Sequence, residues 1–235
     1  MAANDITLAA TQPKLRFVNA ARIQESFTAG LERRILRWLA VRMPACINSD
    51  HLTALGFAAQ LGAGAAFAAT RWTRAGLVLA MVCIVLNWFG DSLDGTLARV
   101  RNQQRPRYGF YVDHMVDSLG AMVIMLGLAA SGLADWRIAI AMLIGFLMLS
   151  IEAYLATYTL GSFRLSYSKF GPTEIRLLLI AACVRALINP NVRLGGHEYR
   201  LFDVGGVIAT AGMAAMCIVS AILHTRSLYR QETLR

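Results

Sequence analysis

The chain has 235 residues, of which 57% are hydrophobic and 16% are charged, and its formal net charge is +9. Soluble domains are about 45–50% apolar, so the composition indicates a protein embedded in a membrane. The basic residues flank apolar runs and form no groove-reading motif, which argues against nucleic acid as a partner. The four cysteines are scattered and lie mostly inside apolar segments. Neither a disulfide framework nor a zinc site is therefore expected.

The N-terminal region is expected to lie outside the bilayer core. Residues 1–13 are predicted to be disordered, and they lack the continuous apolar stretch of a cleaved signal peptide. Residues 14–43 are amphipathic, with arginines off an apolar stripe. The stripe recurs at helical spacing as Phe27, Leu31, Ile35 and Trp38. This pattern predicts a helix in the plane of the membrane interface, and a soluble helix packed on the rest of the domain is the alternative.

Residues 44–223 contain six apolar segments, each close to the roughly 20 residues that a bilayer core requires. The predicted spans are residues 48–70, 75–99, 110–130, 136–158, 173–188 and 204–223. The fifth has a short charge-free core because Arg185 interrupts it. Residues 224–235 are expected to form a tail. The predicted fold class is therefore all-α, a polytopic membrane protein with six transmembrane helices after an amphipathic interfacial helix.

The positions of the basic residues predict the orientation. Most of the 23 lysines and arginines lie before the first span, in the 99–107 connection, between the fourth and fifth spans, and in the tail. Cytoplasmic loops carry an excess of Lys and Arg. Both termini and the 99–107 connection are therefore expected on the cytoplasmic side.

Two pairs of aspartates interrupt the apolar sequence: Asp91 with Asp94, and Asp113 with Asp117. Residues three or four apart share a face of a helix, so each pair is expected to point in one direction. The connection between the pairs is polar and basic and contains a proline, which favours a turn. The second helix would then fold back antiparallel to the first, and the two acid pairs could face each other.

Four carboxylates at close range cannot all stay ionised unless cations are present. Hard divalent ions with oxygen ligands meet this need, Mg²⁺ or Mn²⁺ first, or Ca²⁺. Ionised groups at membrane depth mark function by default. Arg99 follows the first pair, and Gly95 would permit a close approach to the backbone. Metals and a guanidinium together suit chemistry on phosphates.

The pattern resembles the signature of the CDP-alcohol phosphotransferase family, D-x2-D-G-x2-A-R-x8-G-x3-D-x3-D. Its eight fixed residues stand here as Asp91, Asp94, Gly95, Ala98, Arg99, Gly109, Asp113 and Asp117. Nine residues instead of eight separate Arg99 from Gly109, and a loop can absorb the extra one. The start of the first span, INSDHLTALG, also resembles the first-helix entry of this family.

The resemblance implies an integral membrane enzyme, of the cell inner membrane type, in phospholipid biosynthesis. It would transfer a substituted phosphate from a CDP-linked donor to an alcohol and release CMP, with one substrate a lipid. The four aspartates would hold two metal ions, Mg²⁺ or Mn²⁺, and Asp117 would also be the general base. The residues expected to contact the cytidine diphosphate are Gly95, Ala98, Arg99 and Gly109. A homodimer is also implied, with the active site open to the cytoplasm.

Three further polar residues allow two interpretations each. Glu152 could line an acceptor pocket, or it could pair with a neighbouring helix. Glu174 could belong to the same pocket, since Gly-Pro-x-Glu resembles a feature of choline and ethanolamine phosphotransferases, or it could be part of an ordinary helix start. His114 points off the face of the aspartates, so packing or hydrogen bonding is expected instead of metal ligation.

The sequence leaves the substrates and two other functional classes open. The CDP-linked donor could be CDP-diacylglycerol with a small alcohol as acceptor, or a CDP-amino-alcohol with diacylglycerol as acceptor. A divalent-cation transporter would also use intramembrane acids, although no internal repeat is visible. A non-catalytic membrane scaffold is the third alternative.

Overall fold

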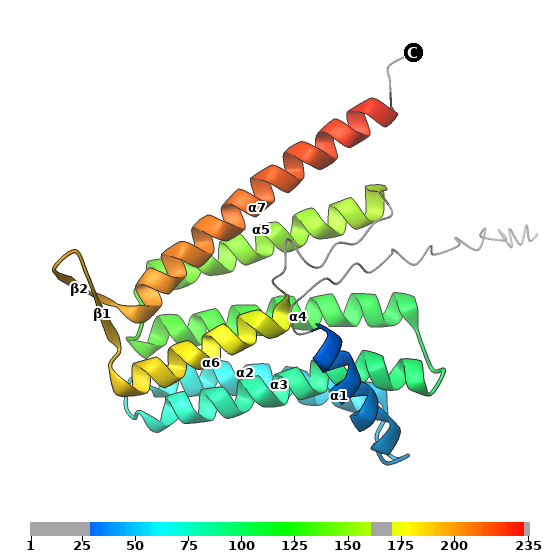
Figure 1. Ribbon diagram of the computed structural model, residues 1–235, viewed down its shortest axis with the longest axis horizontal. Helices are drawn as coiled ribbons and strands as arrows, with labels where there is room; N and C mark the ends of the chain where they lie inside the picture. The colour runs from blue at the N-terminus through cyan, green and yellow to red at the C-terminus, as the bar shows by residue number, and fades with distance from the viewer. Residues whose placement is uncertain (1–28, 161–170, 233–235) are drawn as a thin grey trace, which may run out of the picture.

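The computed structural model describes residues 29–160 and 171–232 (Figure 1). In these ranges the chain forms seven helices and one two-stranded hairpin, which confirms the all-α class. The helices are α1 Ala29–Arg42, α2 Ser49–Ala69, α3 Ala75–Val100, α4 Pro106–Ser131, α5 Trp136–Leu160, α6 Pro172–Ile188 and α7 Leu201–Gln231. The antiparallel hairpin consists of β1 Asn191–Leu194 and β2 His197–Arg200.

Five of these helices, α2, α3, α4, α5 and α7, are long and apolar enough to cross a membrane. The fifth predicted span, residues 173–188, forms helix α6, which has 17 residues and is shorter than the other five. Figure 1 shows that α5 and α7 run in the same direction and that α6, which lies between them in the sequence, runs in the opposite direction. The helices from α2 to α7 therefore alternate in direction, as the six predicted spans require.

Helix α2 packs closely against both α3 and α4, and glycines make the contact possible. A Cβ atom on Gly90 of α3 would stand 2.6 Å from the Gly56 nitrogen and the Leu52 oxygen of α2. A Cβ atom on Gly127 of α4 would stand 2.0 Å from the carbonyl oxygen of Gly64. Small residues at such contacts let helix backbones approach in membrane proteins. This packing fixes α3 relative to α4 and therefore the two aspartate pairs.

Helix α1 lies against one end of α3 (Figure 1) and has two apolar faces. Leu36 and Ala40 are buried in a cluster with Leu93 and Leu97 of α3. The predicted stripe points outward, with Leu31 66% exposed and Trp38 55% exposed. Packing on the domain and an outward apolar stripe therefore occur together, and the outward stripe is what an interfacial helix needs. Phe27 and the predicted disorder of residues 1–13 lie outside the described residues.

The helix of the last predicted span is longer than that span. The prediction stopped the last span at residue 223 and placed a tail after it, but α7 continues without a break to Gln231. A helix that has already formed gains one more hydrogen bond for each residue it adds, so it extends through His224 and the polar residues beyond. The hairpin before α7 was not predicted. Its turn places Gly195 and Gly196 at φ +57° and +85°, a region that glycine enters without steric cost.

Candidate functional site

A cavity of about 520 Å³ opens at the end of the bundle where α1 lies. Its wall is made by α1, the first turns of α2, the last turns of α3 and the first turns of α4 and α6. A volume of this size is typical of sites for small molecules and cofactors. All four predicted aspartates line it, and so do the four residues expected to contact the cytidine diphosphate: Gly95, Ala98, Arg99 and Gly109.

The turn between α3 and α4 brings the two aspartate pairs together. Asn102 adopts a left-handed conformation with φ +54°, which asparagine tolerates better than most residues. Pro106 then occupies the start of α4, where its missing N–H costs nothing. The connection therefore accommodates its extra residue before α4 begins, and Gly109 still lies in the cavity wall.

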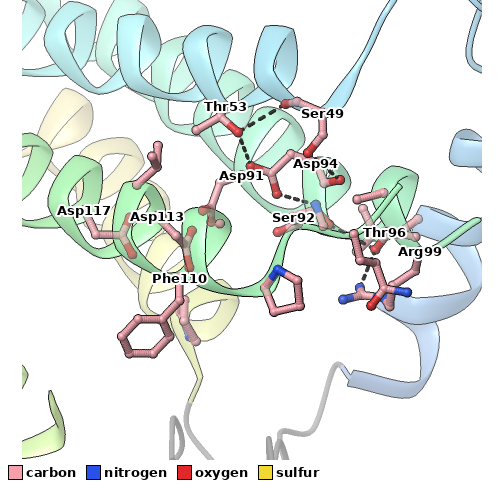
Figure 2. A pocket seen from close by; sticks show the side chains of 18 of the residues that line it. Ser49, Thr53, Asp91, Ser92, Asp94, Thr96, Arg99, Phe110, Asp113 and Asp117 are labelled. Carbon is pink, nitrogen blue, oxygen red and sulfur yellow. Dashed lines mark hydrogen bonds between the residues drawn. The ribbon is translucent and has the colours of Figure 1, made fainter. Parts of the chain in front are cut away.

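Three of the four aspartates converge. Asp91 of α3 and Asp113 and Asp117 of α4 each offer a carboxylate oxygen, and these oxygens lie within 4.8 Å of one another. Figure 2 shows the three side chains directed into the same space from the two facing helices. Three hard oxygen donors at this separation fit a divalent ion such as Mg²⁺ or Mn²⁺. The arrangement is the one the helical spacing predicted for these residues.

Asp94 lies in the same cavity but turns towards α2. The Thr53 hydroxyl donates to its Oδ2 over 2.5 Å, and the backbone N–H of Gly95 contacts its Oδ1 (Figure 2). The Ser49 hydroxyl also donates to the Asp94 carbonyl oxygen at 3.1 Å. Sequence reasoning did not select Thr53 or Ser49. Ser49 and Thr53 are four residues apart just after the Asn48 cap of α2, so they lie on one face of the helix. This spacing was the sequence feature that could have identified them as a pair of site residues.

Arg176 is a further site residue that sequence reasoning missed, because it was used only to predict orientation. It comes from the second turn of α6, and its Nη2 lies 2.5 Å from Oδ2 of Asp91. Arg99, the predicted phosphate-binding cation, donates to the Thr96 hydroxyl at 3.0 Å. Arg33 of α1 and Arg105 of the α3–α4 connection also line the cavity, so its wall carries arginines from three helices and from one connection.

Glu32 joins three helices at the edge of the cavity. Its Oε1 accepts a hydrogen bond from Trp88 Nε1 of α3 at 2.9 Å and from the Thr173 hydroxyl of α6 at 2.7 Å. Glu32 itself belongs to α1 and is only 9% exposed. Helix α1 is therefore tied through this carboxylate to α3 and to the start of α6, the helix that carries Arg176.

Replacing Glu32 with alanine is expected to lower the melting temperature of the protein in detergent. The substitution leaves the Trp88 N–H and the Thr173 hydroxyl without their acceptor, at a cost of about 1–3 kcal/mol. Glu32→Gln keeps an acceptor oxygen and should lose much less. Glu198→Ala on the exposed hairpin is the control for loss of a carboxylate. Equal melting temperatures for Glu32→Ala and the wild type would contradict this role.

The two glutamates considered for an acceptor pocket have partners within the scaffold. Glu152 of α5 lies 2.5 Å from Nδ1 of His224 on α7. Glu174 is buried and accepts from the backbone N–H of Gly171 at 2.9 Å, which caps the start of α6. Neither residue is among the described residues that line the cavity. The pairing and helix-start interpretations account for both positions, because each carboxylate is used within the scaffold.

His114 packs against Phe110, beside the carboxylate cluster. Its Nδ1 donates to the Phe110 carbonyl oxygen at 2.6 Å, and its ring stacks on Phe110 with centroids 4.1 Å apart. The same nitrogen is 3.8 Å from Oδ2 of Asp113. These contacts agree with the predicted packing and hydrogen-bonding role.

Comparison with known proteins adds an independent line of evidence. The model of the CDP-alcohol phosphatidyltransferase family matches residues 47–223, a range that begins just before α2 and ends within α7. The chain is also similar to an archaetidylinositol phosphate synthase of Pyrococcus horikoshii, with 34% identity over 104 residues. That alignment covers 44% of this chain and 52% of the relative, so the match spans about half the length of the curated relative. The family model alone spans most of this chain.

Proposed function

Because the chain belongs to the CDP-alcohol phosphatidyltransferase family, we propose that it transfers a substituted phosphate from a CDP-linked donor to an alcohol. Its five apolar helices of spanning length make it an integral membrane protein. The observation that carries the proposal is the convergence of Asp91, Asp113 and Asp117 within 4.8 Å in one cavity. The reaction would release CMP and would belong to phospholipid biosynthesis.

The aspartates are suited to hold divalent metal. Asp91, Asp113 and Asp117 would be ligands, with Asp94 close by, and Mg²⁺ or Mn²⁺ fits this all-oxygen donor set. Bound metal would neutralise charge on the pyrophosphate of the donor. Fixed charges of this kind act strongly when water is excluded from the site.

The protein residues would bind and orient the reactants. The guanidinium of Arg99 would contact the donor's phosphates, and Gly95 and Gly109 would leave room for the nucleotide. A Cβ atom on Gly109 would meet nothing within 4 Å, so this wall is open. Asp117 would take the proton of the alcohol as the general base. The alcohol oxygen then bonds to the phosphorus while the bond between that phosphorus and the CMP oxygen breaks.

One of the two substrates is expected to be a lipid and the other a water-soluble molecule, and the relative's name indicates which is which. The name of the Pyrococcus relative describes a synthase whose product combines a lipid and an inositol phosphate. We therefore favour a CDP-linked lipid as donor and a small alcohol as acceptor for this chain. The opposite polarity, with a CDP-amino-alcohol donating to diacylglycerol, is the alternative to be tested beside it.

The cavity would open on the cytoplasmic side. Arg101, Arg105 and Arg107 lie in or next to the connection that borders it, and cytoplasmic loops are enriched in such residues. Both chain ends would lie on that side too. The homodimer implied by the family resemblance stays a prediction.

The test is CMP release by the purified protein in detergent with Mg²⁺ or Mn²⁺. One set of reactions pairs CDP-diacylglycerol with glycerol phosphate, serine, inositol or inositol phosphate. The other pairs CDP-choline or CDP-ethanolamine with diacylglycerol. Release from the first set that stops when EDTA is added is the expected result. Release from the second set alone would reverse the polarity, and a folded protein that releases no CMP in either set would contradict the proposal.

A transporter would behave differently in a second assay. Reconstituted vesicles that accumulate Mn²⁺ without any CDP compound would favour the transporter. The proposal predicts no such accumulation.

A further inference from the structure

Asp91, one of the three converging carboxylates, also forms an ion pair with Arg176. The nitrogen and oxygen are 2.5 Å apart, and the side chains of Arg176 and Asp91 are only 16% and 24% exposed. The contact is therefore made within the cavity wall and largely shielded from water. It uses Oδ2 of Asp91, an oxygen that a metal held by the three acids would need or would closely approach.

A guanidinium and a divalent cation compete for the same carboxylate. Their charges have the same sign, and repulsion between charges a few ångströms apart is strong where water is partly excluded. Arginine is permanently charged and cannot relieve the repulsion by losing a proton. When metal enters the cluster, Arg176 must therefore share Asp91 at an energetic cost or move to another anion.

The start of α6 leaves only the side chain of Arg176 to move. Thr173 is hydrogen-bonded to Glu32 of α1, and Glu174 caps Gly171. The first contact holds the backbone near Arg176 against α1, and the second stabilises the first turn of α6. The long side chain of arginine can still rotate into the cavity that it lines together with Arg99, where the donor's phosphates would lie.

We propose that Arg176 is a counter-ion switch: it neutralises Asp91 before metal binds and turns to a phosphate of the CDP-linked donor once metal is bound. This inference rests on the proposed function. It assigns Arg176 two successive anionic partners, a carboxylate and a phosphate, both of which suit a guanidinium. Metal and donor binding are then positively coupled, and by thermodynamic linkage each raises the affinity for the other by the same factor.

The switch predicts effects of opposite sign from one substitution. Without nucleotide, Arg176→Met should bind Mn²⁺ about tenfold more tightly than the wild type, since the competing cation is gone. With saturating Mn²⁺, the same variant should bind CDP about tenfold more weakly, since the phosphate partner is gone. Both factors lie within the range typical of coupled sites. Arg176→Lys keeps the positive charge and should bind Mn²⁺ nearly as the wild type does.

The measurements are Mn²⁺ binding by electron paramagnetic resonance and CDP binding by titration calorimetry, both on the full chain in detergent. Arg137→Met is the matched control, because Arg137 lies over the Trp136 ring in the first turn of α5 and does not line the cavity. This control should change neither affinity. If Arg176→Met does not fold, the same two measurements are made on Arg176→Gln, a second neutral variant.

The outcomes separate the switch from the proposed function. Wild-type protein that binds Mn²⁺, together with neutral variants that bind it equally or less tightly, would overturn the switch and leave the proposed function standing. Unchanged CDP affinity in those variants would overturn it as well. Wild-type protein that binds no Mn²⁺ and releases no CMP would overturn both.

Discussion

Replacing Asp117 with asparagine is expected to abolish CMP release and to leave the fold intact. Asparagine has nearly the same shape, but it cannot take a proton from the alcohol and is a poor ligand for a hard cation. Loss of a general base alone lowers rates by about 10²–10⁴-fold, and the loss of a metal ligand adds to this. The carboxylate is one of three within 4.8 Å, so its removal also relieves repulsion between like charges.

Initial rates of CMP release and melting curves in detergent would be compared for the wild type and Asp117→Asn. Glu198→Gln, an equivalent acid-to-amide change on the hairpin at the far end of the molecule (Figure 1), should keep the wild-type rate. A rate for Asp117→Asn within a few-fold of the wild type would remove Asp117 from its role. A much lower melting temperature would instead show that the carboxylate supports the fold.

Gly90→Ala is expected to lower both stability and activity, although alanine adds a single methyl group. That Cβ would stand 2.6 Å from backbone atoms of Gly56 and Leu52, and backbone cannot move aside as a flexible side chain can. Forcing extra atoms into a packed contact costs about 1–3 kcal/mol. Because Asp91 is the next residue, α3 would carry it away from Asp113 and Asp117, and a displacement of about 1 Å can lower a rate by about 10²-fold.

The control is Gly212→Ala on α7, where an added Cβ would meet nothing within 4 Å. Its melting temperature and its rate of CMP release should equal those of the wild type or rise slightly, because alanine favours helices over glycine. If Gly90→Ala also matched the wild type in both measurements, the contact between α2 and α3 would be looser than the structure indicates.

The sequence predicted those features that depend on local spacing. The spans follow from the lengths of the apolar segments, and the convergence of Asp91 with Asp113 and Asp117 follows from helical periodicity and a turn containing Pro106. The direction of the Asp94 side chain could not be predicted in this way. Helical spacing placed it on the face of Asp91, but the hydroxyl of Thr53 turns its carboxylate towards α2. A side-chain rotation of this kind depends on a neighbour 41 residues away.

The residues that sequence reasoning missed are joined by long-range contacts. Arg176 is 85 positions from Asp91, and Thr173 is 141 positions from Glu32. No periodicity links such pairs, so they become visible only once α1, α3 and α6 have packed. The hairpin was not predicted for a different reason. Each of its strands has four residues, which is too few for an alternating pattern to stand out.

The length of α7 places the Glu152–His224 pair relative to the bilayer. An α-helix of 31 residues is about 46 Å long, and the hydrocarbon core is about 30 Å thick. Even at a tilt of about 40°, the upper end of the usual range, α7 would span about 35 Å. The helix is therefore longer than the hydrocarbon core is thick, and its charged last turns, with Arg226 and Arg230, are expected in the headgroup layer. His224 precedes them by less than two turns, so Glu152 pairs with it near the membrane boundary and not at the bilayer centre.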